Sequence, residues 1–472
     1  MQINRNKTFI GVDLGTTSIK GAVLDVDEMR IRETYALPFP PLVPGLGAGY
    51  CEVDPQAVLA AVQLIIRRLM SHTVSCFGLV MCSQMHGLVV MNEIGEPVSN
   101  VITWRDDRAL QPHYSGAGAF YDVLSNVINE SDKLRMGNNL APNRPLTVLY
   151  TQIERSKHGE TSSFPSSAVP MSLPDFVLSS LCHSPPCTDL TNAVASSAFD
   201  YWSFDWHHEL ISTLGLDRLN WPRIANLGEI VGYYEIDGQP LRCYLPIGDQ
   251  QCALLGSLLT EGELSLNIST GSQVSMISKQ LDLSKSFQTV PYLEGTFLKT
   301  VVHVPAGRAL NALIRVLSEL ASAAGFVLDD PWTYIEHAVT VTADTNMTVD
   351  LAFFPSSCGD RGSIQNITED TLTIGHLFAG AFKGMARNYF NCALRISPTK
   401  DWDRVVLSGG LVVKSEALRL AICETFKNHY RLVPSEIDSA LMGLLVLASV
   451  FGEKYGSTTD AFPALRETYL LK

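Results

Sequence analysis

The sequence feature that most constrains the fold is a pattern that occurs twice. Residues 8–25 form two β-rich runs around a polar turn, Asp13-Leu-Gly-Thr-Thr-Ser18. Residues 263–278 repeat this arrangement around a second polar turn, Asn267-Ile-Ser-Thr-Gly-Ser272. Two apolar runs separated by a short turn that contains glycine predict a β-hairpin. Because each half of the chain opens on such a hairpin, we expect two similar domains whose polar turns face one another across a cleft.

Strands and helices alternate along the rest of both halves. Residues 55–70 carry apolar residues at three- and four-residue steps and a proline at the first turn, which predicts a helix. Short apolar runs at 77–82 and 88–92 predict strands. The second half is expected to contain a strand at 404–407 and helices at 307–323, 375–395, 415–428 and 437–451. This alternation indicates an α/β fold.

The predicted domains are residues 1–244 and residues 245–472. The turn signal Asp237-Gly-Gln-Pro240 precedes the proposed boundary. Residues 110–200 are less regular and rich in proline and serine, so we interpret them as an insertion that covers one side of the first domain.

Composition excludes several classes of function. The chain has 35 Lys and Arg against 48 Asp and Glu, a net charge of −13, which disfavours binding to nucleic acids and to anionic membranes. Residues 439–452 form the most apolar stretch, shorter than the roughly 20 residues that span a bilayer. No signal-peptide pattern precedes Asp13. The ten cysteines form no CxxC pair, which favours reduced thiols, so we expect a cytoplasmic protein.

The first polar turn has the chemistry of a phosphate-binding loop. Gly15 allows close approach of the backbone, and Thr16 and Thr17 offer hydroxyl and N–H groups to phosphate oxygens. Lys20 supplies a positive charge, and Asp13 is placed to hold Mg²⁺, through water. The segment is not a Walker A loop, because G-x-x-x-x-G-K-[ST] is absent.

Five further polar segments, together with this first turn, are distributed over almost the whole chain. They are Ser83-Gln-Met-His-Gly87, Thr103-Trp-Arg-Asp-Asp107, Gly248-Asp-Gln-Gln251, Asn267-Ile-Ser-Thr-Gly271 and Ser408-Gly-Gly410. Together with GVDLGTTSIK, this set resembles the FGGY carbohydrate kinases. The resemblance implies two ribonuclease-H-like domains of the actin and hexokinase superfamily around a central cleft. It also implies that residues 1–244 bind the sugar and that residues 245–472 bind the nucleotide. It also implies ATP and Mg²⁺ in that cleft, and transfer of the γ-phosphoryl group to a sugar hydroxyl.

The resemblance carries roles to individual residues. Asp249 matches the catalytic base, and a carboxylate suits the removal of a proton from a sugar hydroxyl. The sugar side is matched by Gln84, Met85, His86, Trp104, Asp106, Asp249 and Gln250. Thr270 and Gly271 match the second phosphate turn, and the adenosine side is matched by Gly307, Asn311, Gly409, Gly410 and Ser415. Ordinary structural roles stay open for each, such as a turn at Gly248-Asp249 or a strand–helix connection at Gly409-Gly410.

The sequence departs from the family pattern in two places. An acidic-Arg-Thr-Pro loop is replaced by Ser357-Cys-Gly-Asp-Arg-Gly362, and the turn after Gly410 reads Leu-Val-Val-Lys414. These departures concern the fine contacts to the nucleoside rather than the use of ATP.

Within the family, the motifs resemble most closely the kinases of ketoses, with sedoheptulose as the first expected substrate and xylulose or another polyol as the alternative. A different class is a nucleotide switch similar to Hsp70 or actin, and a third interpretation is a sugar sensor without turnover. The sequence leaves the oligomeric state open, with a homodimer as one option.

Overall fold

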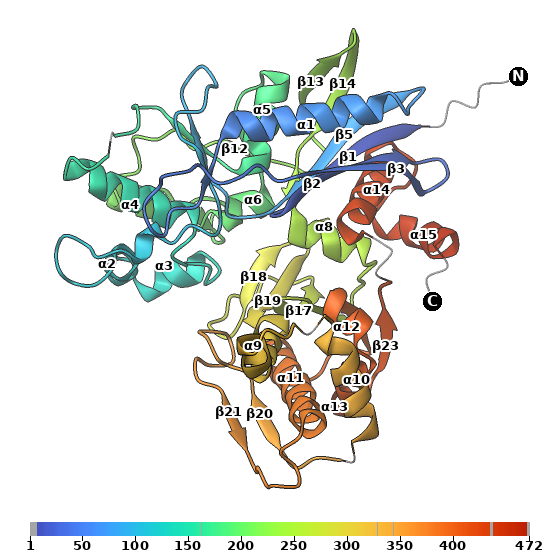
Figure 1. Ribbon diagram of the computed structural model, residues 1–472. Coiled ribbons are helices and arrows are strands. Elements are labelled where there is room, and N and C mark those ends of the chain that lie inside the picture. The colour runs from blue at the N-terminus through green and yellow to red at the C-terminus, as the bar shows by residue number, and fades with distance from the viewer. Residues whose placement is uncertain (1–6, 162, 328, 343, 435–437, 470–472) are drawn as a thin grey trace, which may run out of the picture.

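The computed structural model describes residues 7–161, 163–327, 329–342, 344–434 and 438–469. Two α/β lobes, each built around a mixed β-sheet, lie one above the other in Figure 1. The expected two-domain α/β fold is therefore confirmed. Among the described residues, no helix combines the length and the apolar character needed to cross a membrane.

The first sheet is built from the N-terminal hairpin and the strands that follow it. Strands β1 (Thr8–Leu14), β2 (Ser18–Asp25) and β3 (Arg30–Pro38) are antiparallel, and all seven residues of β1 are buried. On the other side of β1, β5 (Cys76–Ser83) runs parallel to it. Strands β14 (Gln239–Tyr244) and β15 (Ile247–Gly248) both pair in parallel with β5, and β13 (Ile230–Ile236) closes the edge.

The second sheet repeats this topology. Strands β16 (Glu263–Ile268), β17 (Ser272–Ser278) and β19 (Phe297–Val304) are consecutive antiparallel neighbours, and β18 (Gln288–Pro291) extends the β19 edge. Strands β22 (Arg404–Ser408) and β23 (His429–Leu432) add in parallel beyond β16. The similarity between the two polar turns thus reflects a repeated order of strands.

Helices cover both faces of the first sheet. On one face lies α1 (Pro55–Met70), which the Asp54 side chain caps and whose valine, isoleucine and leucine stripe is buried. On the other face, α14 (Ser439–Phe451) packs against β1, β2 and β5, followed by α15 (Phe462–Thr468). Helices α14 and α15 thus lie beside the N-terminal strands (Figure 1). The domain division after residue 244 stays a prediction. Helices α14 and α15 follow the second sheet in the sequence but pack on the first sheet.

Helix α14 also contacts α8 (Asp249–Gly256) closely at the junction of the lobes. A Cβ atom at Gly256 would lie 1.8 Å from the Ser439 carbonyl oxygen, and one at Gly443 would lie 2.0 Å from the Cys252 carbonyl oxygen. Both glycines are therefore required for this packing. The predicted start of this helix at residue 437 lies outside the described residues.

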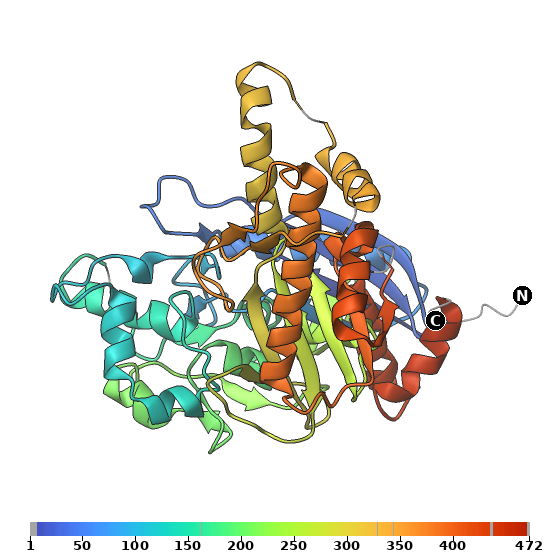
Figure 2. The same cartoon turned by 90° about the horizontal axis from the view of Figure 1, so that it is seen from below.

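In the second lobe, α11 (Ile374–Ile396) packs against β17 and β19 of the sheet. Helices α10 (Pro331–Val341) and α13 (Glu416–Phe426) pack against α11. The lobe also contains α12 (Gly410–Lys414) and α9 (Gly307–Ala323), and Figure 2 shows α9 projecting from the body of the molecule. A short hairpin joins β20 (Thr348–Asp350) to β21 (Ser363–Gln365).

The irregular segment after residue 110 forms the side of the first lobe. It contains α2 (Phe120–Val127), α3 (Glu130–Arg135), α4 (Pro145–Lys157), α5 (Leu173–Cys182), α6 (Leu190–Ala195) and α7 (His208–Thr213). Short strands connect them, namely β8 (Val169–Met171), β9 (Cys187–Asp189), β10 (Phe199–Asp200), β11 (Asp205–Trp206) and β12 (Arg223–Ala225). The expected strand at 88–92 is β6 (Val89–Met91), which pairs with β8 instead of joining the main sheet. Upstream, β4 (Glu52–Val53) pairs with β7 (Val101–Ile102).

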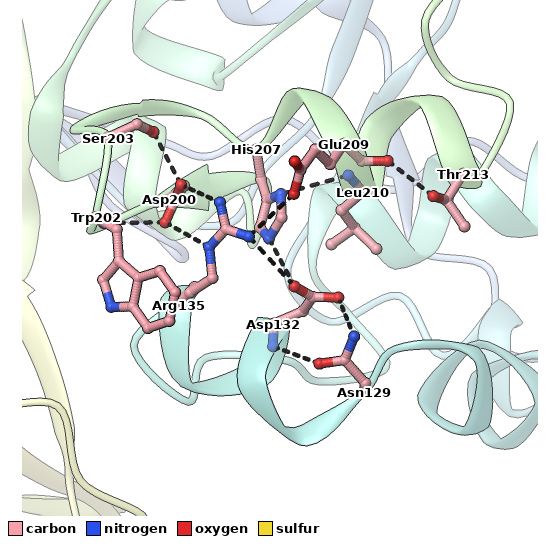
Figure 3. Close-up of polar contacts among 10 residues, drawn as sticks. All are labelled: Asn129, Asp132, Arg135, Asp200, Trp202, Ser203, His207, Glu209, Leu210 and Thr213. Atoms are coloured by element: carbon pink, nitrogen blue, oxygen red, sulfur yellow. Dashed lines mark hydrogen bonds and ion pairs between the residues drawn. The ribbon is translucent and has the colours of Figure 1, made fainter.

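Figure 3 shows the polar network that joins α3, α7 and the β10–β11 hairpin. The Arg135 guanidinium donates to Asp200 and to Glu209, and the His207 ring contacts the Asp132 carboxylate at 3.2 Å. Next to this network, the Tyr201 hydroxyl donates to the Thr289 carbonyl oxygen on β18 at 2.5 Å. The insertion is thereby fastened internally and also touches the second lobe.

Candidate functional site

Three parallel strands of the first sheet end at the same edge. Ser83 at the end of β5 lies opposite Leu14 on β1 and Gly248 on β15. The segments that follow these strands are the first polar turn, residues 84–86 and residues 249–250. Ligands of open α/β sheets bind at the carboxyl ends of such strands. The fold therefore brings together three motifs that are far apart in the sequence.

A cavity of about 520 Å³ lies between the two polar turns. Asp13 and Lys20 line it from the first hairpin, and Asn267 and Ser269 line it from the second. The expectation that both turns face one cleft is confirmed. Among the predicted site residues, this cavity collects Asp13, Lys20, Gln250, Gly409 and Gly410.

The Asp13 carboxyl is buried at the base of this cavity. Burial, and then the negative charge of Asp438, raise its pKa to about 6, against the opposing effect of Lys20. The Cys82 thiol donates a hydrogen bond to Asp13 at 3.6 Å. Lys20 forms an ion pair with Asp438 at 2.7 Å. Among the described residues, Lys20 is the only basic one that lines this cavity, so its charge is already paired with a carboxylate.

Asp249 occupies the first position of α8, directly after β15. Burial, and then the charge of Asp13, raise the pKa of its carboxyl to about 7, while the backbone N–H groups at the start of the helix act in the opposite direction. A carboxyl with a pKa near neutrality is suited to accept a proton at physiological pH.

A second cavity, of about 660 Å³, adjoins the first and shares Ser269 and Gly410 with it. Five of the residues expected on the nucleotide side line it, namely Thr270, Gly307, Asn311, Gly410 and Ser415. The two adjoining cavities offer an elongated site, wide enough at one end for a nucleoside and polar at the other.

Glycines let the second polar turn approach its neighbours. Gly409 has φ +99°, and a Cβ there would lie 2.4 Å from the Ile268 carbonyl oxygen. The Gly307 N–H donates to the Ser269 carbonyl oxygen at 3.1 Å, which joins the start of α9 to the turn. Gly271 lies at the exposed tip, where its carbonyl oxygen accepts from the Ser269 N–H. The Ser415 hydroxyl caps α13 by accepting from the Leu418 N–H.

The segment after β5 is held in place by its own side chains. Gln84 is buried and donates to the Gly15 carbonyl oxygen at 3.3 Å, so it supports the first turn. Met85 packs against Gly248, where a Cβ would lie 2.9 Å from its sulfur atom. The His86 Nδ1 bonds the Ala195 carbonyl oxygen at 2.9 Å. Because a carbonyl only accepts, Nδ1 carries the proton and Nε2 is left as an acceptor.

Burial, and then the nearby Arg144 guanidinium, hold the pKa of His86 well below its usual range. The imidazole is therefore neutral at physiological pH. A neutral imidazole suits a residue that accepts a hydrogen bond from a hydroxyl group rather than one that binds an anion.

The three remaining predicted sugar-side residues have different surroundings. The Trp104 indole N–H donates to the Thr16 hydroxyl at 3.1 Å, and the Gln250 amide donates to Gln273 at 3.0 Å, which links α8 to β17. Asp106 is fully buried and its carboxylate accepts from Arg108 and from the Cys51 N–H. Its oxygens are thus occupied by a structural ion pair and not directed at a ligand, which differs from the sequence-based expectation.

Sequence reasoning missed several residues of the two cavities. Asp438 comes next to Lys20 only in the folded chain, although its position before an apolar helix marks it as an N-cap. Trp332 and Glu336 on α10 line the nucleoside-sized cavity. No helix is predicted here from the sequence patterns, although the Asp330-Pro331 pair is a signal that could have marked the start of α10. Nothing in the sequence indicates which side of that helix faces the cavity.

The carboxylates of the first cavity suit a magnesium ion only in part. No cluster of three or more histidine, cysteine, aspartate or glutamate side chains that could hold a metal occurs among the described residues. Mg²⁺ in kinases is held by one or two carboxylates together with water and substrate phosphates, however, and Asp13 in a polar cavity fits that pattern.

Comparisons with known proteins agree with this geometry. Residues 8–256 match the N-terminal domain of the FGGY family of carbohydrate kinases. The human sedoheptulokinase is 22% identical over 93% of this chain and 96% of its own length. Among solved structures, a gluconate kinase from Lactobacillus acidophilus superposes with a TM-score of 0.83 at 19% identity, covering 97% of this chain and 92% of its own. A ligand-bound xylulose kinase from the same organism gives 0.82 at 19% identity with the same coverage.

Proposed function

Because this chain belongs to the FGGY family of carbohydrate kinases, we propose that its sugar substrate is a ketose and that sedoheptulose is the first candidate. The family establishes a sugar kinase that uses ATP. The choice of sedoheptulose is supported by the human sedoheptulokinase, which aligns over nearly the full length of both chains. The observation that carries the proposal is the position of Asp249, at the ends of the parallel strands and next in sequence to Gln250, which lines the cavity between the two turns.

Asp249 is the proposed general base. A sugar hydroxyl is a weak nucleophile, and a carboxylate within hydrogen-bond reach takes its proton as the new P–O bond forms. An acyclic ketose would lie along the cleft with its terminal hydroxyl at Asp249. Met85 next to Gly248 and the acceptor Nε2 of His86 would then contact the sugar.

The nucleotide is proposed to occupy the two adjoining cavities. Its adenosine end would lie among Thr270, Gly307, Asn311, Gly410 and Ser415, and its phosphates would lie between the two polar turns. Asp13 is the proposed residue for Mg²⁺, through water, and the ion would offset the charge of the phosphate oxygens.

The test measures ADP release from ATP with a panel of C5 to C7 ketoses, against ATP alone. Release that depends on a ketose supports the proposal, and the ketose with the highest kcat/KM identifies the substrate. Xylulose is the alternative within the panel, because a xylulose kinase from Staphylococcus xylosus also aligns, at 23% identity over 58% of this chain. ADP release that no sugar accelerates would instead favour a nucleotide switch, and no release at all would favour a sensor.

A further inference from the structure

Trp104 and Thr16 connect the predicted sugar side to the predicted phosphate side. The indole Nε1 of Trp104 lies 3.1 Å from the Oγ1 of Thr16, although 88 positions separate the two residues. Both residues are partly buried. An indole N–H can only donate a hydrogen bond, whereas a hydroxyl can donate one and accept two. The threonine oxygen is therefore the acceptor in this contact.

The direction of this hydrogen bond determines which further hydrogen bonds the threonine hydroxyl can form. Since its oxygen accepts from Trp104, its own proton points away from the indole and is available to an acceptor elsewhere. A phosphoryl group presents only acceptor oxygens. A hydroxyl that is already fixed as a donor stabilises such a group better than one that is free to rotate, because no reorganisation is needed during the reaction.

A second set of bonds holds Trp104 itself. The Asn143 side-chain amide donates to the Trp104 carbonyl oxygen at 2.6 Å, and the Asn143 Oδ1 accepts from the Arg144 guanidinium at 3.0 Å. A carbonyl only accepts and a guanidinium only donates, so the orientation of the Asn143 amide is fixed by its partners.

Arg144 is well placed to keep this arrangement rigid. Its side chain is 5% exposed and makes no ion pair within the described part of the chain, and its Nε donates to Asn139. A buried cation whose hydrogen bonds all go to neutral amide and carbonyl oxygens is costly to move, because any displacement leaves donors unpaired. The backbone of Trp104 is thereby anchored on the insertion.

We propose that Trp104 is a positioning residue for phosphoryl transfer, whose indole N–H fixes the Thr16 hydroxyl as a hydrogen-bond donor to the transferred group. The proposal rests on the proposed phosphate role of the first turn. It gives the indole nitrogen a task that is separate from any packing of the ring against the sugar. The polar end and the apolar face of one side chain would thus serve the two substrates.

The test compares Trp104→Phe, which keeps an aromatic ring and deletes the donor, with the wild type on the best ketose. We expect kcat to fall by about two- to tenfold, the range for one hydrogen bond, while the KM for the ketose stays within about twofold. In the Thr16→Val background, Trp104→Phe should cost no further activity, because the hydroxyl that it orients is gone. A raised ketose KM with unchanged kcat, or additive losses in the double variant, would overturn the proposal.

The matched control is Trp206→Phe, which deletes an indole hydrogen bond elsewhere, from buried Trp206 to the Pro222 carbonyl oxygen at 2.8 Å. It should lower the melting temperature without the selective loss of kcat. An equal loss of kcat in this control would show that the effect of Trp104→Phe is a general loss of stability, against the proposal.

A titration of Mg-ADP with and without aluminium fluoride, which mimics the transferred phosphoryl group, needs no sugar. We expect aluminium fluoride to tighten ADP binding in the wild type. The gain in ADP affinity should be smaller in both Trp104→Phe and Thr16→Val. Equal tightening in all three proteins would overturn the positioning role, even where ketose turnover is normal. If no ketose is turned over, the proposed substrate class fails and this titration still decides on Trp104. Absence of tightening in the wild type contradicts the phosphate role of the first turn, and with it the positioning role of Trp104.

Discussion

Burial and the nearby charge of Asp13 raise the pKa of the Asp249 carboxyl to about 7. Two acids in one buried site cannot both be ionised as easily as either alone, so their environments separate their roles. Asp13 lies beside Lys20 and Asp438 in the cavity between the turns, whereas Asp249 begins a helix at the end of β15. This division suits one carboxylate for the metal and another for the proton.

Replacing Asp249 by asparagine tests the proposed base. The change removes the proton acceptor and keeps the size of the side chain, so we expect kcat to fall at least about 100-fold, the lower range for general-base assistance. Nucleotide affinity, measured by titration with ADP, should barely change. Asp237→Asn at the exposed β13–β14 turn is the matched control and should retain full activity. A variant that keeps most of its turnover would remove Asp249 from the mechanism.

The pH dependence of activity follows from the same carboxyl. A base must be deprotonated to act, so kcat/KM for the ketose should rise with pH up to about 7 and level off above it. Below the transition we expect a tenfold loss for each pH unit, as for one titrating group. Steady-state kinetics from pH 5.5 to 9 measure this profile. A rate that is already maximal at pH 5.5 contradicts the raised pKa.

Asp13→Asn should give a different signature. The neutral amide would bind Mg²⁺ poorly, so we expect a higher requirement for Mg-ATP, with sugar affinity largely kept. The measurement is the KM for Mg-ATP at several Mg²⁺ concentrations, together with a separate ketose titration. Excess Mg²⁺ should restore part of the activity of this variant but none of the activity of Asp249→Asn. Equal behaviour of the two variants would argue against separate roles.

The sequence predicted the parts of the fold that local patterns determine. The two hairpins, the helix at residues 55–70 and the alternation of strands and helices are set by apolar spacing and turn residues, which act over a few positions. The convergence of both turns on one cavity followed from the repeat itself.

The rest depends on contacts between distant segments. Lys20 was expected to face phosphate, and only folding brings Asp438 to within 2.7 Å of it. Asp106 was expected to face the sugar, but the buried Arg108 two positions later binds its carboxylate. A motif shows which side chains are near a site, whereas their orientation is decided by partners that the motif does not contain.

Asp175 on α5 provides a test of stability away from the cleft. Its carboxyl is buried, and burial raises its pKa to about 8. Since the folded-state pKa lies above the unfolded one, the stabilisation by the neutral acid is fully present below about pH 4 and is lost as pH rises toward 8. Asparagine does not titrate. The free energy of unfolding of Asp175→Asn relative to the wild type should therefore increase by more than about 1 kcal/mol between pH 5 and pH 8, measured by urea denaturation. A difference that does not change with pH would contradict the raised pKa.

Gly248→Ala tests the contact that brings Met85 next to Asp249. A Cβ at this position would lie 2.9 Å from the Met85 sulfur atom and 2.6 Å from the Gln251 Oε1, so both side chains have to move. Because Met85 belongs to the proposed sugar side, the KM for the ketose should rise several-fold, with a smaller effect on the KM for Mg-ATP. Overpacking should also destabilise the fold by about 1–3 kcal/mol. The matched control is Gly47→Ala, where the nearest atom would be an ordinary 3.7 Å away, and it should leave both constants unchanged. If Gly248→Ala loses stability but keeps the ketose KM, Met85 packs beside the base without contacting the sugar.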